Sequence, residues 1–230
     1  MTSFVLLHGA FHGGWCWARV APVLRAAGHD VFTPTQTGLG ERAHLLSRDI
    51  TLDTFVQDLV AVLETEELDD VVLVGHSFGG NAITGAAERV PGRIRSLIYL
   101  DGLIPQSGRT PLDCVPPEVA AHRRSLAAET GGLSVPPPEP GFFGVPPGPE
   151  ADWVQRRMTP HPFGAYESAL TYKGRRATAS LAPMCSAPRR SMSRLPPAVI
   201  TPGRSRTGVG VSSRPVMTRW SRTPRPPPRC

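Results

Sequence analysis

The sequence predicts an α/β protein built around a doubly wound, mostly parallel sheet. Short, wholly apolar runs recur within the first 100 residues, as expected for strands that are buried on both faces of such a sheet. Segments whose apolar residues repeat with helical spacing lie between these runs. The 230 residues are enough for one α/β domain with a sizeable core.

The expected elements alternate along the chain, with strands at residues 4–7, 30–33, 71–74 and 94–100. Val20 to Ala27 has a helical pattern that stops at Gly28. Farther along, apolar residues at positions 52, 55, 56, 59, 60 and 63 form one face of a second helix. Strands that alternate with helices in this way favour parallel pairing.

A proline- and glycine-rich segment follows the fourth strand. We expect residues 105–148 to form a loop-and-helix excursion over the sheet. Residues 153–172 are expected to return as a helix that is broken near Pro160 and Pro162. Together these segments predict a small cap over about residues 105–170.

Composition changes abruptly after residue 174. Residues 175–230 contain 12 Arg and no Lys, Asp or Glu, whereas residues 1–174 contain the other 13 basic residues and all 19 acidic ones. The tail thus carries +12, against −6 for the rest of the chain. It also holds 10 of the 26 prolines and none of the 7 histidines. Such a break marks a disordered appendage or foreign sequence, so we expect an α/β domain over residues 1–174 and a separate tail over residues 175–230.

Several classes of protein do not fit this sequence. No run of 18 or more apolar residues occurs, so we expect no membrane span. The N-terminus lacks the basic region and apolar core of a signal peptide. The four cysteines, Cys16, Cys114, Cys185 and Cys230, have neither metal-ligand spacing nor the pattern of a disulfide framework. We therefore expect a cytoplasmic protein, and the pattern leaves its oligomeric state open.

Gly75-His76-Ser77-Phe78-Gly79 has the form G-x-S-x-G at a strand-to-helix junction. In this context a tight turn lifts the serine hydroxyl out of the sheet, and the helix N-terminus behind it favours developing negative charge. The same pattern occurs in ordinary glycine-serine turns, but the strand before it and the small residues after it favour a nucleophile. We therefore predict that Ser77 is the catalytic nucleophile.

His8-Gly9-Ala10 follows the first strand, where such a site needs its second oxyanion donor. We predict that the backbone N–H groups of Ala10 and Phe78 point at the same oxyanion. The loss of one such donor typically lowers the rate about 10²–10³-fold. The alternative is an ordinary glycine loop. The G-x-S-x-G turn at Ser77, farther along the chain, makes this alternative less favourable.

These motifs resemble those of α/β-hydrolases, in the branch that contains plant methyl-ester esterases, hydroxynitrile lyases and their bacterial relatives. The motifs are His8 to Trp17, Thr33-Pro34 with Gly38 to Arg42, Gly75 to Gly80, and Tyr99-Leu100-Asp101, in the order and at the spacing of the family. The resemblance covers about residues 3–174. It implies hydrolysis of a small carboxylic ester by a Ser–His–acid triad under a small cap, without a cofactor. The lyases of this branch carry threonine where this chain has Gly9, which favours esterase over lyase.

The triad histidine and acid that the resemblance implies remain unassigned. The family's histidine comes from late in the chain, whereas all 7 histidines here lie between residues 8 and 161. We expect His8, His12 and Trp15 to have structural or pocket-lining roles and His76 to point away from Ser77. The remaining histidines fall on the surface, in loops or in the cap: His29, His44, His122 and His161. His8 and His12 share a glycine loop without accompanying carboxylates, so no metal site is expected.

The tail has an explanation in the genetic code. When each codon's last base joins the first two bases of the next codon, residues 180–185 can encode Pro-Arg-Thr-Tyr-Val, which is similar to the family's next core strand. In the same frame, residues 214–221 can encode Ala-Gly-His-Asp-Ala-Met-Val, which is similar to the family's catalytic-histidine segment. We therefore interpret the tail as a frameshifted C-terminus that lacks the family's base and its usual acid. Asp101 ends the fourth expected strand, and we expect it to be structural rather than a substitute acid.

Three hypotheses about function remain open. The first is a serine esterase by ancestry, impaired by the lost histidine. The second is an inactive relative that still binds a small ligand. The third takes the Arg-rich tail as an arm that binds nucleic acid or an anionic surface. Against it, the tail lacks interleaved aromatic residues apart from one tryptophan and contains no lysine. We therefore expect a small ester as partner rather than nucleic acid or membrane.

Overall fold

The computed structural model describes residues 1–172. Its main sheet has four strands, β1 (Ser3–Leu7), β2 (Asp30–Phe32), β3 (Val71–His76) and β4 (Ile94–Leu100), in the order β2-β1-β3-β4. Every neighbouring pair in this sheet is parallel. The predicted α/β class and parallel sheet are therefore confirmed.

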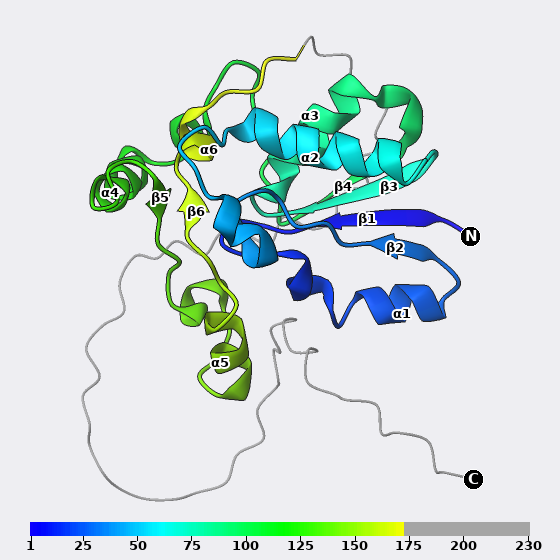
Figure 1. The fold of residues 1–230 in the computed structure, drawn as a ribbon, viewed down its shortest axis with the longest axis horizontal. Coiled ribbons are helices and arrows are strands. Elements are labelled where there is room, and N and C mark those ends of the chain that lie inside the picture. Colours follow the sequence, from blue (N-terminus) through cyan, green and yellow to red (C-terminus); the bar gives the residue numbers. More distant parts are fainter. Residues whose placement is uncertain (173–230) are drawn as a thin grey trace, which may run out of the picture. The chain divides into compact units, whose positions relative to one another are not determined.

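Helices connect the strands, as parallel pairing requires. α1 (Ala21–Ala26) follows β1, α2 (Leu52–Thr65) follows β2, and α3 (Gly79–Arg89) follows β3. Figure 1 shows α2 and α3 side by side on one face of the sheet and α1 on the other. The sheet is thus covered on both faces over β1, which explains why residues 4–7 of that strand are all apolar.

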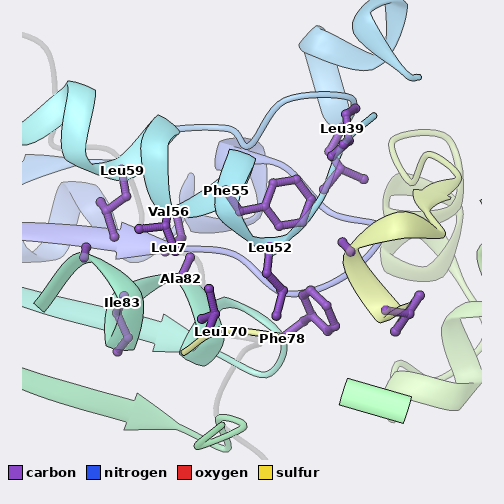
Figure 2. Close-up of a cluster of buried hydrophobic side chains, with 14 of the residues drawn as sticks. Leu7, Leu39, Leu52, Phe55, Val56, Leu59, Phe78, Ala82, Ile83 and Leu170 are labelled. Carbon is purple, nitrogen blue, oxygen red and sulfur yellow. The ribbon is translucent and has the colours of Figure 1, made fainter. Parts of the chain in front are cut away.

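The main core lies between the sheet and the pair α2 and α3. All six apolar positions of the predicted helical face are buried in α2: Leu52, Phe55, Val56, Leu59, Val60 and Leu63. They pack with Leu7, Leu73 and Ile83, and Figure 2 shows part of this cluster. Each such side chain contributes about 1.5–3 kcal/mol when it is fully buried. The side chains of Thr51 and Thr54 form a capping box that fixes where α2 begins.

A smaller cluster lies on the α1 face, where Trp17 and Ala21 pack on Leu6, Val31, Val72 and Val74. This cluster does not extend to β4. The side chains of Ile98 and Leu100 are 37% and 43% exposed, and within residues 1–172 β4 pairs with β3 alone. The described sheet therefore ends in a partly uncovered edge strand.

The segment after β4 was predicted to form a cap and is called the cap. Its elements are short. They are η4 (Pro111–Cys114), α4 (Pro117–Ala128), β5 (Ser134–Val135), η5 (Pro140–Phe143), α5 (Pro149–Gln155), β6 (His161–Pro162) and α6 (Gly164–Glu167), where η marks a 3-10 helix. The expected return helix over residues 153–172 is wrong in extent, because helix is present only in α5 and α6. Prolines on both sides of His161 favour an extended backbone there, and His161 pairs with Val135 in an antiparallel bridge.

The described chain ends beside the start of the cap. The hydroxyl of Tyr172 donates to the carbonyl of Pro105 at 2.6 Å, and the hydroxyl of Ser107 donates to the carbonyl of Tyr172 at 2.9 Å. The predicted tail over residues 175–230 lies outside the described residues. Over residues 1–172, the helices are all too short or too polar to cross a membrane.

Candidate active site

Ser77 lies in a strained turn between β3 and α3. Its φ is 50°, which is uncommon for a residue with a side chain and typically costs about 1–3 kcal/mol. Its amide donates to the carbonyl of Leu100 at 3.2 Å, and its carbonyl accepts from the amide of Leu103 at 2.9 Å. Both ends of the residue are therefore held by the segment that follows β4.

The glycines on either side of Ser77 are required by close backbone contacts. A Cβ at Gly75 would lie 2.9 Å from the carbonyl carbon of Gly79, and a Cβ at Gly79 would lie 2.6 Å from the carbonyl oxygen of His8. Side chains essentially never approach backbone atoms so closely. The G-x-S-x-G spacing thus allows α3 to start directly behind Ser77 and against the loop that follows β1.

The loop that carries Ala10 lies directly beside Ser77. A Cβ at Gly9 would be 3.0 Å from the Cβ of Ser77. Ala10 is half-buried against the core, and Phe11 after it has a φ of 67°. The structure therefore brings the loop of Ala10 together with the turn of Ser77 and Phe78, which were predicted from motifs about 70 residues apart.

His8 is fully buried, and both its ring nitrogens are engaged by the backbone. Nδ1 donates to the carbonyl of Gly9 at 2.8 Å, and Nε2 accepts from the amide of Gln36 at 3.1 Å. Burial lowers the pKa of His8 to about 4, so the ring is neutral at pH 7. A neutral ring with both nitrogens occupied connects two loops and cannot serve Ser77 as a base.

His12 and Trp15 link the same loop to the cap. The ring of His12 stacks on Trp15 at 5.1 Å between centroids and meets the edge of Phe143 at 5.1 Å. Nδ1 of His12 donates to the carbonyl of Ala10 at 2.7 Å, and burial lowers the pKa of His12. Trp15 in turn contacts Trp153 of α5, with ring centroids 5.0 Å apart. These side chains form the wall between the loop and the cap.

His76 faces Trp17, with the two ring centroids 6.3 Å apart. Burial lowers its pKa, which the nearby Asp101 partly raises again. Asp101 itself is exposed at the end of β4. His29 is half-buried against Phe4, whereas two other histidines, His44 and His122, are exposed.

Sequence reasoning placed His161 in the cap but missed its surroundings. The side chain is fully buried, and its ring contacts four aromatic rings, those of Phe11, Phe55, Phe78 and Tyr166. Burial lowers the pKa of His161 well below its usual value. Neither ring nitrogen has a hydrogen-bond partner among the described residues. No signal in the sequence connects residue 161 with residues 11 and 78, because these contacts arise only from the fold.

Two further features bear on ligand binding. Residues 1–172 contain no group of three or more His, Cys, Asp or Glu side chains that could hold a metal ion. A hollow of about 400 Å³ lies between η1 (Gly14–Trp17), α1 and η2 (Gly40–Leu45), but Ser77, Ala10 and Phe78 do not line it. Because the candidate chemistry lies elsewhere, we assign no role to this hollow.

Comparisons with known proteins agree with this geometry. A family model described as "Alpha/beta hydrolase family" matches residues 4–227. A carbendazim hydrolyzing esterase of Nocardioides sp. (strain SG-4G) is 45% identical over 184 residues, which cover 76% of this chain and 75% of that protein. An alpha-hydroxynitrile lyase of Arabidopsis thaliana is 35% identical over 109 residues, 47% of this chain and 42% of that protein.

The fold also has a close match among solved structures. An extracellular alpha/beta-hydrolase from a Paenibacillus species, described as sharing structural and functional homology with tobacco salicylic acid binding protein 2, is 27% identical. The two chains superpose with a TM-score of 0.69 over 75% of this chain and 72% of the other. The family match spans most of the sequence, and the bacterial relative covers three quarters of both chains. The chain belongs to the alpha/beta hydrolase family.

Proposed function

We propose that this chain is a serine hydrolase of small carboxylic esters, with Ser77 as nucleophile and the amides of Ala10 and Phe78 as oxyanion donors. The observation that carries the proposal is the strained turn at Ser77, packed against the loop of Ala10. A turn that stores backbone strain and places a hydroxyl at a helix N-terminus is typical of a functional residue.

The reaction requires a proton acceptor as well as a nucleophile. The Ser77 oxygen attacks the ester carbonyl carbon, and the two amides stabilise the negative charge that develops on the carbonyl oxygen. The alcohol leaves, and water then hydrolyses the acyl-serine. Both ring nitrogens of His8 are occupied, and the sequence contains no histidine after His161. We therefore propose that the chain lacks the family's base and is strongly impaired, because the loss of a triad member removes about 10⁴–10⁶ of the rate.

Gly9 supports esterase over lyase chemistry. Known relatives include both an esterase and a hydroxynitrile lyase, so family membership alone does not decide between them. A threonine at this position would place its Cβ 3.0 Å from the Cβ of Ser77, closer than most side chains pack. The loop geometry of this chain therefore fits glycine, as the esterase hypothesis expects.

The same proposal includes a cytoplasmic location and hydrolysis without a cofactor. Among residues 1–172, Cys16 and Cys114 are free, and Cys114 is exposed, which fits the reducing cytoplasm better than an oxidising compartment. Ester hydrolysis by a serine and two backbone amides needs no cofactor. An inactive relative that binds a small ester is the alternative, and the missing late histidine favours it.

Hydrolysis of 4-nitrophenyl acetate by the purified full chain tests the proposal. We expect slow turnover that Ser77→Ala lowers to the level of the buffer, while Ser125→Ala, on the exposed face of α4, leaves the rate unchanged. Acetyl transfer to Ser77, measured as a mass increase of the intact protein, distinguishes nucleophilic catalysis from binding alone. If Ser77→Ala retains the rate and no acetylated protein forms, Ser77 is not a nucleophile and the proposal is wrong.

A further inference from the structure

The ring of His161 contacts both sides of the proposed oxyanion site. Its centroid lies 4.7 Å from that of Phe78 and 5.7 Å from that of Phe11. Phe78 carries one of the two proposed donor amides, and Phe11 directly follows Ala10, which carries the other. Phe55 on α2, shown in Figure 2 with Phe78, and Tyr166 complete the aromatic enclosure of the imidazole.

Two residues before His161, a backbone hydrogen bond also joins the cap to the loop of Ala10. The amide of Thr159 donates to the carbonyl of Phe11 at 3.0 Å. The hydroxyl oxygen of Thr159 accepts from the amide of Gly40 at 3.0 Å, which ties the same segment to the start of η2. Residues 159–161 of the cap therefore hold the loop of Ala10 through both the main chain and the aromatic ring.

The loop needs such support because its conformation is unfavourable on its own. Phe11 has a φ of 67°, and a residue with a side chain is strained in this region and persists there only where surrounding contacts fix it. The contacts made by Thr159 and His161 are of this kind. If they are removed, we expect Phe11 to relax and the amide of Ala10 to turn away from its present direction.

We propose that His161 is a positioning residue of the oxyanion site: by packing on Phe11 and Phe78 together, it fixes the spacing between the two loops that carry the donor amides. This inference rests on the proposed function. His161 acts by packing of its planar ring rather than by hydrogen bonding, because neither ring nitrogen has a hydrogen-bond partner among the described residues. A phenylalanine at this position should therefore keep the geometry and avoid the penalty of burying unpaired polar atoms.

Phenylboronic acid tests the proposal without requiring turnover. The Ser77 oxygen forms a bond to boron and releases its proton to water, and a boron-bound oxygen of the tetrahedral adduct occupies the oxyanion position. The dissociation constant and the tetrahedral ¹¹B signal of the full chain both report this adduct. We expect His161→Ala to weaken binding by about tenfold or more, with the 10²–10³-fold effect of a lost oxyanion donor as the upper limit. We expect His161→Phe to stay within about threefold of the parent.

Leu63→Ala is the matched control. Leu63 is fully buried in the same core, but it lies two turns of α2 beyond Phe55, about 12 Å along the helix axis. This truncation should lower the urea midpoint of unfolding without changing the affinity for the boronate. If His161→Ala does not fold, His161→Leu replaces it, because leucine retains apolar volume without a planar ring.

The outcomes separate the two proposals. Loss of the adduct in Ser77→Ala supports the proposed function, and an unchanged affinity in that variant contradicts it and this inference together. With Ser77 supported, weak binding by His161→Ala and near-parent binding by His161→Phe support the positioning role. If His161→Phe binds as weakly as His161→Ala, the nitrogens matter rather than the ring shape, and the inference is wrong. It is equally wrong if both variants bind like the Leu63→Ala control.

Discussion

Ser77 holds a backbone conformation that favours glycine, and this predicts an unusual pair of stability changes. Its φ is 50°, and a residue with a side chain loses about 1–2 kcal/mol in this left-handed region. Ser77→Gly removes this strain, but it also makes the unfolded chain more flexible. The added flexibility cancels about 0.5–1 kcal/mol of the stability gained. We therefore expect Ser77→Gly to be about 0.5–1 kcal/mol more stable than Ser77→Ala, although both variants lack the hydroxyl.

Urea unfolding of the full chain, followed by tryptophan fluorescence, measures this difference. With a typical denaturant dependence of about 1–3 kcal/mol per molar urea, the midpoints should differ by roughly 0.2–1 M. Glu67→Gly is the positive control, because Glu67 is exposed after α2 with a φ of 51°. Ala61→Gly is the negative control, because it lies on the exposed face of α2 and should lose about 1 kcal/mol.

One result would refute this reasoning. If Glu67→Gly is stabilised but Ser77→Gly is no more stable than Ser77→Ala, the turn at Ser77 stores no strain. The backbone evidence for Ser77 as a functional residue would then be lost, and only the motif and the neighbouring loop would support it.

Three other predictions concern activity, loop packing and pH. Correcting the reading frame near codon 175 should raise the rate of 4-nitrophenyl acetate hydrolysis by orders of magnitude. If the rates before and after correction are equal and Ser77→Ala abolishes both, another base serves Ser77. Gly9→Thr should lower the free energy of unfolding by about 1–3 kcal/mol through overpacking against Ser77, whereas Gly92→Thr, with open space around its Cβ position, should not. Because burial lowers the pKa of His8 from 6.5 to about 4, the unfolded chain binds more protons between these values. The contribution of neutral His8 to stability is therefore complete above pH 6.5 and is lost on acidification, by up to about 3 kcal/mol. His8→Asn should flatten this pH dependence in urea titrations, and His44→Gln, at an exposed position, should not.

Features with local causes could be predicted from the sequence. Apolar runs gave strands at nearly the expected residues, and β4 spans the expected 94–100. The turn at Ser77 was predictable because close contacts at Gly75 and Gly79 leave no room for side chains, so the physical requirement appears directly as a motif. The loop of Ala10 was predictable for a similar reason, since Gly9 approaches Ser77 closely.

Features that depend on long-range contacts could not be predicted. The cap contains elements of only 2–12 residues, too short for periodicity to distinguish helix from strand, and tertiary contacts hold them. An example is the hydroxyl of Ser168, which accepts from the amide of Leu52 at 2.8 Å across 116 residues. The enclosure of His161 by rings from four separate segments has the same origin. A histidine between two prolines predicts an extended backbone, but the sequence does not indicate which side chains it meets.

The uncovered edge at β4 bears on the origin of the tail. Strands of a parallel sheet are normally covered on both faces and paired with neighbours, yet Ile98 and Leu100 are 37% and 43% exposed within the described part of the chain. The shifted frame would supply a strand-like Pro-Arg-Thr-Tyr-Val segment shortly after residue 172, where the described chain ends next to Pro105.

One observation from the comparisons concerns the tail directly. The family match extends to residue 227, so it includes most of the tail as well as residues 1–174. We interpret the tail as frameshifted because a frameshift would explain three features together: the exposed edge strand, the change in composition and the absence of histidine after His161. A disordered appendage would explain the composition alone. The DNA sequence around codons 170–185 decides between them, because a single inserted or deleted base there would restore the strand, the acid and the base together.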